Sequence, residues 1–243
     1  MKHKAYIVFS ILLTLTIIYQ CKTPYIIIDD KLKNKTDPMT VEGHNTLSFK
    51  KKVITYGEFN TSKVQKGWMK VSYPITIFTK AEKARQKFSF TQYDGKDNAL
   101  QVNCAAVYVN KELPLFKDFL SYDIESQDFF AGSLYSEKHA HSWDFIVYYP
   151  EDENFEKEVK GYLKQDNSEI IIKGAYINKM QFLPDEPEGY EFILNNKTIA
   201  AVETINNGYV WMLPELDEEL KLTLAGLSTA LLLREDPKKA VDK

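Results

Sequence analysis

The fold of this chain is decided by the stretch from Leu213 to Pro237, which reads LPELDEELKLTLAGLSTALLLREDP. Four acidic residues lie near its start, where the helix dipole favours negative charge. Pro214 suits a first helical position and Arg234 suits the last turn, so we expect a helix over residues 214–234. The twelve residues 222–233 carry no charge on any face of this helix. Such a helix has to be enclosed by other parts of the protein.

The length of this uncharged run indicates a core helix. Twelve residues rise only about 18 Å in an α-helix, well short of the roughly 30 Å of a bilayer core. Most of the chain before the run has the pattern of strands separated by turns. The sequence therefore predicts a mainly β fold: an antiparallel, barrel-like sheet packed around one buried apolar C-terminal helix, after an N-terminal signal segment.

Strand signals are clearest in three places, each bounded by turn residues. The segments Lys87–Tyr93 and Ala99–Val109 flank an Asp-Gly turn and predict a hairpin. The segments Glu158–Lys164 and Glu169–Tyr176 predict a second hairpin. Three further strands between Tyr190 and Met212 form a meander that runs directly into the helix.

The C-terminal part of the chain resembles a known fold. The resemblance is carried by Tyr190–Leu194, Ile199–Glu203, Gly208–Trp211 and the helix Leu216–Leu233. In this order they resemble the tubby-like fold, which tubby, the LURP-one-related proteins and the phospholipid scramblases share. The resemblance implies a barrel with the C-terminal helix running through it. Several proteins of this fold bind phosphoinositides or act at membranes. This sequence has no residues that match their ligand-binding residues. A lipocalin-like or sandwich domain with a C-terminal helix is the alternative.

The start of the chain is a separate segment. Residues 1–4 are basic, Ala5–Tyr19 is an uncharged apolar run, and Cys21 follows it closely. This order is typical of an export signal. The segment resembles the signal peptides of bacterial lipoproteins, in which a cysteine after the apolar run becomes the lipidated first residue. The resemblance implies that Cys21 is acylated, and an uncleaved signal anchor is the alternative.

These signals predict one folded domain on a membrane anchor. We expect a lipoprotein signal peptide at residues 1–20, a lipid-anchored tether at 21–44, a β-rich domain at 45–236 and a polar tail at 237–243. A first strand at Tyr25–Ile28 would shorten the tether. The expected location is the bacterial cell envelope, with the domain in the periplasm or at the cell surface.

Composition and cysteine content limit the partners. The chain has 31 basic and 34 acidic residues and a net charge of -3, which gives no electrostatic reason to expect nucleic acid. If Cys21 carries lipid, Cys104 is the remaining cysteine, and we expect it to be a buried thiol in a strand. The expected partners are the membrane, through the lipid anchor, and an envelope protein or a lipid ligand.

The pair His139 and His141 has the spacing of metal ligands. Residues two apart in a strand point to the same face, so both imidazoles could share an ion with Glu137 or Asp144. A solvated loop is the alternative interpretation. We interpret the acids at 217–219 as residues that complement the dipole at the start of the helix.

Two functions from different classes remain. The sequence contains no nucleophile elbow, P-loop, dinucleotide fingerprint or HExxH motif, and we expect no cofactor. These absences favour a non-catalytic binding module for a lipid, a peptide or an envelope partner. The alternative is an envelope metal-assisted hydrolase that uses His139 and His141. The aromatic side chains Phe129, Trp143 and Tyr148 are expected in the core, and lining of a ligand pocket is the other possibility.

Overall fold

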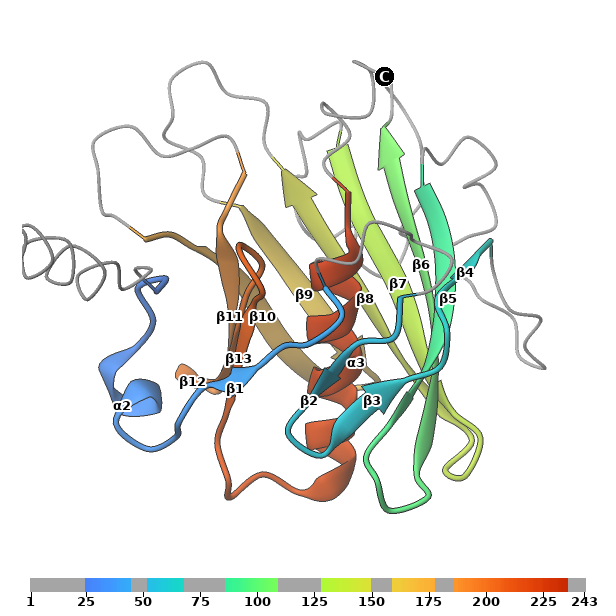
Figure 1. The fold of residues 1–243 in the computed structure, drawn as a ribbon, viewed down its shortest axis with the longest axis horizontal. Coiled ribbons are helices and arrows are strands. Elements are labelled where there is room, and N and C mark those ends of the chain that lie inside the picture. The colour runs from blue at the N-terminus through green and yellow to red at the C-terminus, as the bar shows by residue number, and fades with distance from the viewer. Residues whose placement is uncertain are drawn as a thin grey trace, which may run out of the picture.

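The structure, a computed structural model, describes residues 25–44, 52–67, 86–108, 128–149, 159–177 and 186–235. Within these ranges, thirteen strands form one antiparallel sheet, which curls into a nearly closed barrel around one long helix (Figure 1). The prediction of a mainly β fold with a C-terminal core helix is confirmed. The expected signal peptide at 1–20, Cys21 and the tail at 237–243 lie outside the described residues.

Most strands pair with their neighbours in sequence. The strands are β1 (Met39–Thr40), β2 (Thr55–Tyr56), β3 (Phe59–Thr61), β4 (Gln65–Lys66), β5 (Gln86–Tyr93), β6 (Ala99–Tyr108), β7 (Asp128–Ser136), β8 (His141–Tyr149), β9 (Lys160–Gln165), β10 (Ser168–Ala175), β11 (Gly189–Leu194), β12 (Lys197–Glu203) and β13 (Tyr209–Met212). The helices are α2 (Asp30–Lys33) and α3 (Glu218–Leu233). The sheet order is β1-β13-β12-β11-β10-β9-β8-β7-β6-β5-β3-β2, and β4 pairs with β5.

A single bridge joins the two edges of this sheet. Next to β1, the backbone N–H of Glu42 donates to the carbonyl of Thr55 at 2.9 Å, and the N–H of Thr55 donates back at 3.2 Å. Because Thr55 begins β2, the two edge strands of the order come together. Within the described ranges the sheet is therefore nearly closed, and few of its strand-edge groups are left for other chains.

The predicted hairpins β5–β6 and β9–β10 and the meander β11–β13 are confirmed. Turn chemistry explains why local sequence predicted them well. Asn195 and Asn196 join β11 to β12 with φ of 50° and 60°. Two successive left-handed residues match the twist of a hairpin, and Asn tolerates this conformation better than most residues.

Helix α3 fills the barrel. All twelve residues from Leu222 to Leu233 are buried, and the helix packs against β5, β6, β7 and β12. Gly226 allows a close approach to the sheet, because a Cβ there would lie only 2.8 Å from Cδ2 of Leu134 and 3.2 Å from Cδ2 of Leu100. The prediction that this helix is enclosed on all sides is confirmed. Within the described ranges, no helix has the length and apolar character needed to cross a membrane.

The expected start of the helix at Pro214 is wrong. The side chain of Asp217 accepts a hydrogen bond from the backbone N–H of Leu220 at 2.7 Å, which makes Asp217 the N-cap and Glu218 the first helical residue. A cap of this kind satisfies an N–H that has no partner within the helix. At the other end Arg234 is the C-cap, and its side chain lies in a buried cluster of charges.

The polar side chains of α3 connect it to the sheet. Thr229 Oγ1 donates to Gln92 Oε1 at 2.8 Å, and the Tyr56 hydroxyl donates to the carbonyl of Ala225 at 2.7 Å. Gln92 Nε2 in turn donates to the carbonyl of Asn60 at 3.0 Å. Burial raises the pKa of Tyr56. These bonds join the helix to β2, β3 and β5, so they fix its rotation inside an otherwise apolar core.

Residues 25–44 belong to the folded domain. Ile26, Ile28 and Leu32 are buried, and α2 packs on the outside of β12 and β13 (Figure 1, left). Met39 pairs with Val210 in β13. Of the expected tether over residues 21–44, the described residues 25–44 pack against the sheet, because Ile26 and Ile28 lie two residues apart and supply apolar side chains that its outer face can bury.

Glu203 lies beneath this segment, and its titration should affect stability. Glu203 is fully buried, its Oε2 accepts from the N–H of Ile26 at 3.0 Å, and burial raises the pKa of its carboxyl above the ordinary 4.5. Its contribution to stability is therefore present below the ordinary pKa and lost as pH rises through the raised one. We expect the unfolding free energy of Glu203→Gln, relative to wild type, to increase with pH across this window and then level off. Urea unfolding from about pH 4 to 8 measures this, and a difference that falls with pH would contradict it.

Candidate functional site

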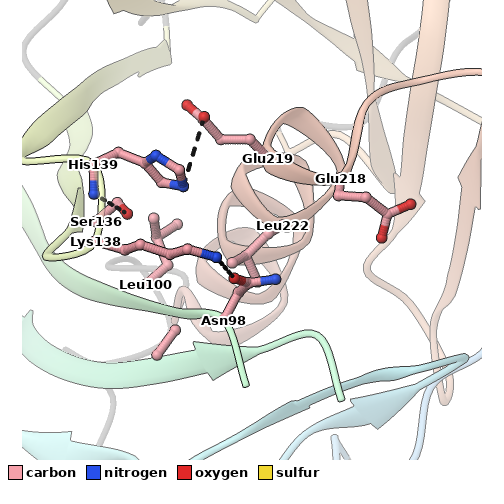
Figure 2. A pocket seen from close by; sticks show the side chains of 9 residues that line it. Asn98, Leu100, Ser136, Lys138, His139, Glu218, Glu219 and Leu222 are labelled. Atoms are coloured by element: carbon pink, nitrogen blue, oxygen red, sulfur yellow. Dashed lines mark hydrogen bonds and ion pairs between the residues drawn. The ribbon is translucent and has the colours of Figure 1, made fainter. Parts of the chain in front are cut away.

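A pocket opens at the end of the barrel where α3 begins (Figure 2). Its volume is about 240 Å³, and it is lined by Asn98, Ala99, Leu100, Ser136, Lys138, His139, Glu218, Glu219 and Leu222. These residues come from the start of β6, the β7–β8 turn and the first turns of α3. Ligand pockets usually measure roughly 300–1,000 Å³, so this pocket suits a small ligand or one end of a larger one.

The β7–β8 turn places the two histidines side by side. His139 lies in the turn, Ala140 has a left-handed φ of 51°, and His141 is the first residue of β8. The backbone N–H of His139 donates to Ser136 Oγ at 3.4 Å. The two ring centroids lie 5.5 Å apart. The two imidazoles therefore lie close together, as predicted. The cause is the β7–β8 turn, whereas the sequence predicted that both residues would lie in one strand.

A carboxylate from α3 meets both imidazoles. Figure 2 shows the contact with His139, whose Nε2 lies 4.0 Å from Glu219 Oε2. Glu219 Oε1 lies 2.6 Å from Nε2 of the second histidine, His141. These three side chains are between 23% and 43% exposed, so solvent reaches them. Glu137, one of the two acids expected beside the histidines, instead accepts from Gln101 Nε2 at 2.5 Å.

The spacing of this cluster is that of a direct contact between side chains. Zinc binds nitrogen and oxygen ligands at about 2.0–2.2 Å, so two ligands of one ion are roughly 3 Å or more apart. The 2.6 Å contact between His141 and Glu219 leaves no room for an ion between those atoms. Within the described part of the chain, no group of three or more His, Cys, Asp or Glu side chains is arranged to hold a metal ion.

A chain of hydrogen bonds holds Lys138 at the pocket wall. Lys138 Nζ donates to Asn98 Oδ1 at 2.7 Å, and Asn98 Nδ2 donates to Asp94 Oδ2 at 2.6 Å. Burial acts to raise the pKa of Asp94, but the hydrogen bonds from Asn98 and from the N–H of Lys96 outweigh it and lower the pKa. Asp94 therefore stays ionised, orients Asn98, and through Asn98 positions the ammonium group of Lys138.

The acids of the pocket already contact basic side chains. Glu218 lies 2.5 Å from Lys96 Nζ and 3.4 Å from Lys221 Nζ, and the hydrogen bond from Lys96 is the main reason that the pKa of Glu218 is lowered. Glu219 contacts His141. Lys138, by contrast, contacts the neutral amide of Asn98 in the bond described above. The pocket can therefore offer a cation to an incoming anionic group.

Other residues singled out in the sequence lie away from this pocket. Cys104 is buried in β6, as predicted, and burial raises the pKa of its thiol. Phe129 and Trp143 are buried, and Tyr148 contacts the ring of Tyr162; none of these aromatic residues lines the pocket. Sequence reasoning missed Lys138 and Asn98, because no local pattern shows that the start of β6 meets the β7–β8 turn.

Comparison of the chain with models of known protein families, with curated proteins and with solved structures found no match. The functional assignment therefore depends on the residues and geometry of the protein itself.

Proposed function

We propose that this protein is a membrane-anchored lipoprotein of the bacterial cell envelope whose domain is a non-catalytic binding module. The basic, apolar, cysteine order of residues 1–21 supports acylation of Cys21 as the anchor. The helix-filled barrel supports the tubby-like resemblance, which we keep as part of the same proposal. The observation that carries the binding assignment is the pocket at the start of α3. Because α3 occupies the barrel interior, the end of the barrel is where a ligand can enter.

The chemistry of the pocket favours a peptide with a free carboxylate as its ligand. Lys138 and His139 offer donors on one wall, and Leu100 and Leu222 offer apolar surface close by. An ammonium and a carboxylate form a charge-assisted hydrogen bond that is about twice as strong as a neutral one. A volume of about 240 Å³ suits one or two residues of a peptide. We therefore propose that the C-terminal carboxylate and the final apolar side chain of a peptide bind here.

An envelope metal-assisted hydrolase is the second candidate. The observation that favours it is the convergence of His139 and His141 on one carboxylate, Glu219. An ion could bind there only after His141 and Glu219 separate from their 2.6 Å contact. Binding without catalysis needs no such rearrangement, and it is the function that we prefer.

A pair of matched probes tests the proposal. N-acetyl-alanyl-leucine carries the carboxylate, and its C-terminal amide differs only by lacking it. We expect calorimetric titration of the purified full-length protein in detergent to show tighter binding of the acid. Lys138→Ala should weaken this binding roughly tenfold, the loss expected for one charge-assisted hydrogen bond. Lys160→Ala is the control, because Lys160 is exposed on β9 and pairs with Tyr148, near the end of β8 that lies away from His141.

Two results would contradict the proposal. Equal binding of the acid and the amide would show that the carboxylate is not recognised. Stoichiometric zinc or manganese in the purified protein, lost when His139→Ala and His141→Ala are combined, would favour the hydrolase. Mass spectrometry of the same sample tests the anchor. An intact Met1 terminus with unmodified Cys21 would replace the lipoprotein with a signal-anchored protein.

A further inference from the structure

Residues 25–29 run along the outside of the sheet as an extra extended segment. The N–H of Ile27 donates to the carbonyl of Tyr176 at 2.8 Å, and the N–H of Asp29 donates to Glu191 Oε1 at 2.7 Å. Side chains of an extended segment alternate between its two faces. Ile26 is accordingly buried, whereas Tyr25 and Ile27 are 46% and 43% exposed.

The exposed Tyr25 is part of an aromatic cluster. Its ring packs edge-to-face on Tyr209 at 4.9 Å and on Trp211 at 6.0 Å between centroids. Tyr25, Ile27 and the half-buried Tyr209 form a surface that is apolar and carries phenolic hydroxyl groups, whereas Trp211 is only 3% exposed. Tyrosine and tryptophan are enriched where proteins meet the headgroup layer of a membrane, because one end of each side chain is apolar and the other is polar.

The covalent chain places this surface close to the proposed anchor. Three residues, Lys22 to Pro24, separate Cys21 from Tyr25. A fully extended chain spans at most about 3.6 Å per residue, so Tyr25 is within roughly 14 Å of the acylated residue. The headgroup region on each side of the hydrocarbon core is itself about 5–7 Å thick. Residues 25–44 pack on the domain, so they do not act as a flexible linker that would let the domain move away from the membrane.

We propose that the surface formed by Tyr25, Ile27 and Tyr209, called here the anchor face, lies on the phospholipid headgroups. The inference rests on the proposed acylation of Cys21 and adds an orientation to it. The anchor face lies over β11–β13. The β7–β8 turn, which lines the pocket, is separated from these strands by β9 and β10 in the sheet order, so it lies on another side of the barrel. The docked domain therefore holds its peptide pocket away from the bilayer, toward ligands of the envelope.

Two variants of the full-length acylated protein, each with one added cysteine, test this orientation. Ile27→Cys places a fluorescent label on the anchor face, and Glu137→Cys places the same label on the exposed β7–β8 turn. Cys104 is buried and acylated Cys21 has no thiol, so the label reacts at the new position. The proteins are reconstituted in phosphatidylethanolamine and phosphatidylglycerol vesicles, with or without brominated acyl chains. We expect bromine to quench the label at position 27 several-fold more than the label at position 137.

The possible failures are distinguishable. Equal quenching at both positions, with Cys21 shown by mass spectrometry to be acylated, overturns the anchor face and leaves the anchor intact. Unmodified Cys21 overturns the anchor and the inference together. Quenching of the label at position 27 by aqueous iodide is also measured at increasing protein-to-lipid ratios. If the label is shielded from iodide only at high ratios, a second copy of the chain covers this surface, and the docking inference is wrong.

Discussion

Leu227→Asp is expected to yield no folded domain. Leu227 is fully buried in the middle of α3, inside the barrel. Truncating such a leucine to alanine costs roughly 2–5 kcal/mol, and burying an unpaired carboxylate costs more. A typical domain is stable by only about 5–15 kcal/mol. Circular dichroism during heating should therefore show no cooperative loss of β-structure in the variant.

A matched substitution separates this effect from a general intolerance of charge. Ile171→Asp makes the same kind of change on the outer face of β10, where the side chain is 36% exposed, and this variant should fold. Deletion of residues 213–243 should give insoluble protein. A deletion variant that keeps a cooperative melt near the parent temperature would show that the helix is peripheral to folding, contrary to its position in the barrel.

Arg234→Ala is expected to destabilise the domain by roughly 3–5 kcal/mol, the cost of removing one partner of a buried ion pair. The Arg234 side chain is 5% exposed. Its guanidinium group binds Glu186 through both terminal nitrogens, lies 3.4 Å from Asp128 Oδ2 and stacks 3.5 Å above the ring of Tyr149. Without Arg234, the Glu186 carboxylate loses its cation. Denaturant unfolding measures the loss.

Two further variants identify the cause of this loss. Arg234→Lys keeps the charge but loses the two parallel bonds and the stacking on Tyr149, so we expect an intermediate stability. Combining Arg234→Ala with Glu186→Gln should cost less than the sum of the single changes, because the second change removes the unpaired carboxylate. Single variants that each cost under about 1 kcal/mol would show that the cluster is not a structural ion pair.

Much of the local structure was predictable because its causes are local. The hairpins were visible because turn residues such as Asn195 and Asn196 lie between segments with the character of strands. The core helix was visible because residues 222–233 carry no charge on any face. The exact start was missed, since Pro214 and Asp217 both suit a helix N-terminus. The hydrogen bond from Leu220 to Asp217 decides between them.

The candidate site was predictable only in part. The spacing of His139 and His141 indicated that the imidazoles would meet, and they do. Their shared carboxylate, Glu219, comes from a helix that begins far along the chain, and the Lys138 ammonium is positioned by Asn98 at the start of β6. Neither contact produces a periodic pattern in the sequence. Each contact depends on which ends of strands and helix lie next to one another in the folded barrel.

The class of fold follows from the sequence, because a helix with no charged face cannot be stable in water and the strands before it had to enclose it. The burial of Cys104 likewise follows from the order and kind of neighbouring residues. Contacts in the folded domain were needed to show that residues 25–44 pack on the sheet and that Arg234 is buried among acids and tyrosines. They were also needed to show that the pocket forms where α3 enters the barrel. These features depend on contacts between segments that are distant in sequence. Such contacts are set by the order of strands in the sheet and by how much apolar surface each segment can bury against it.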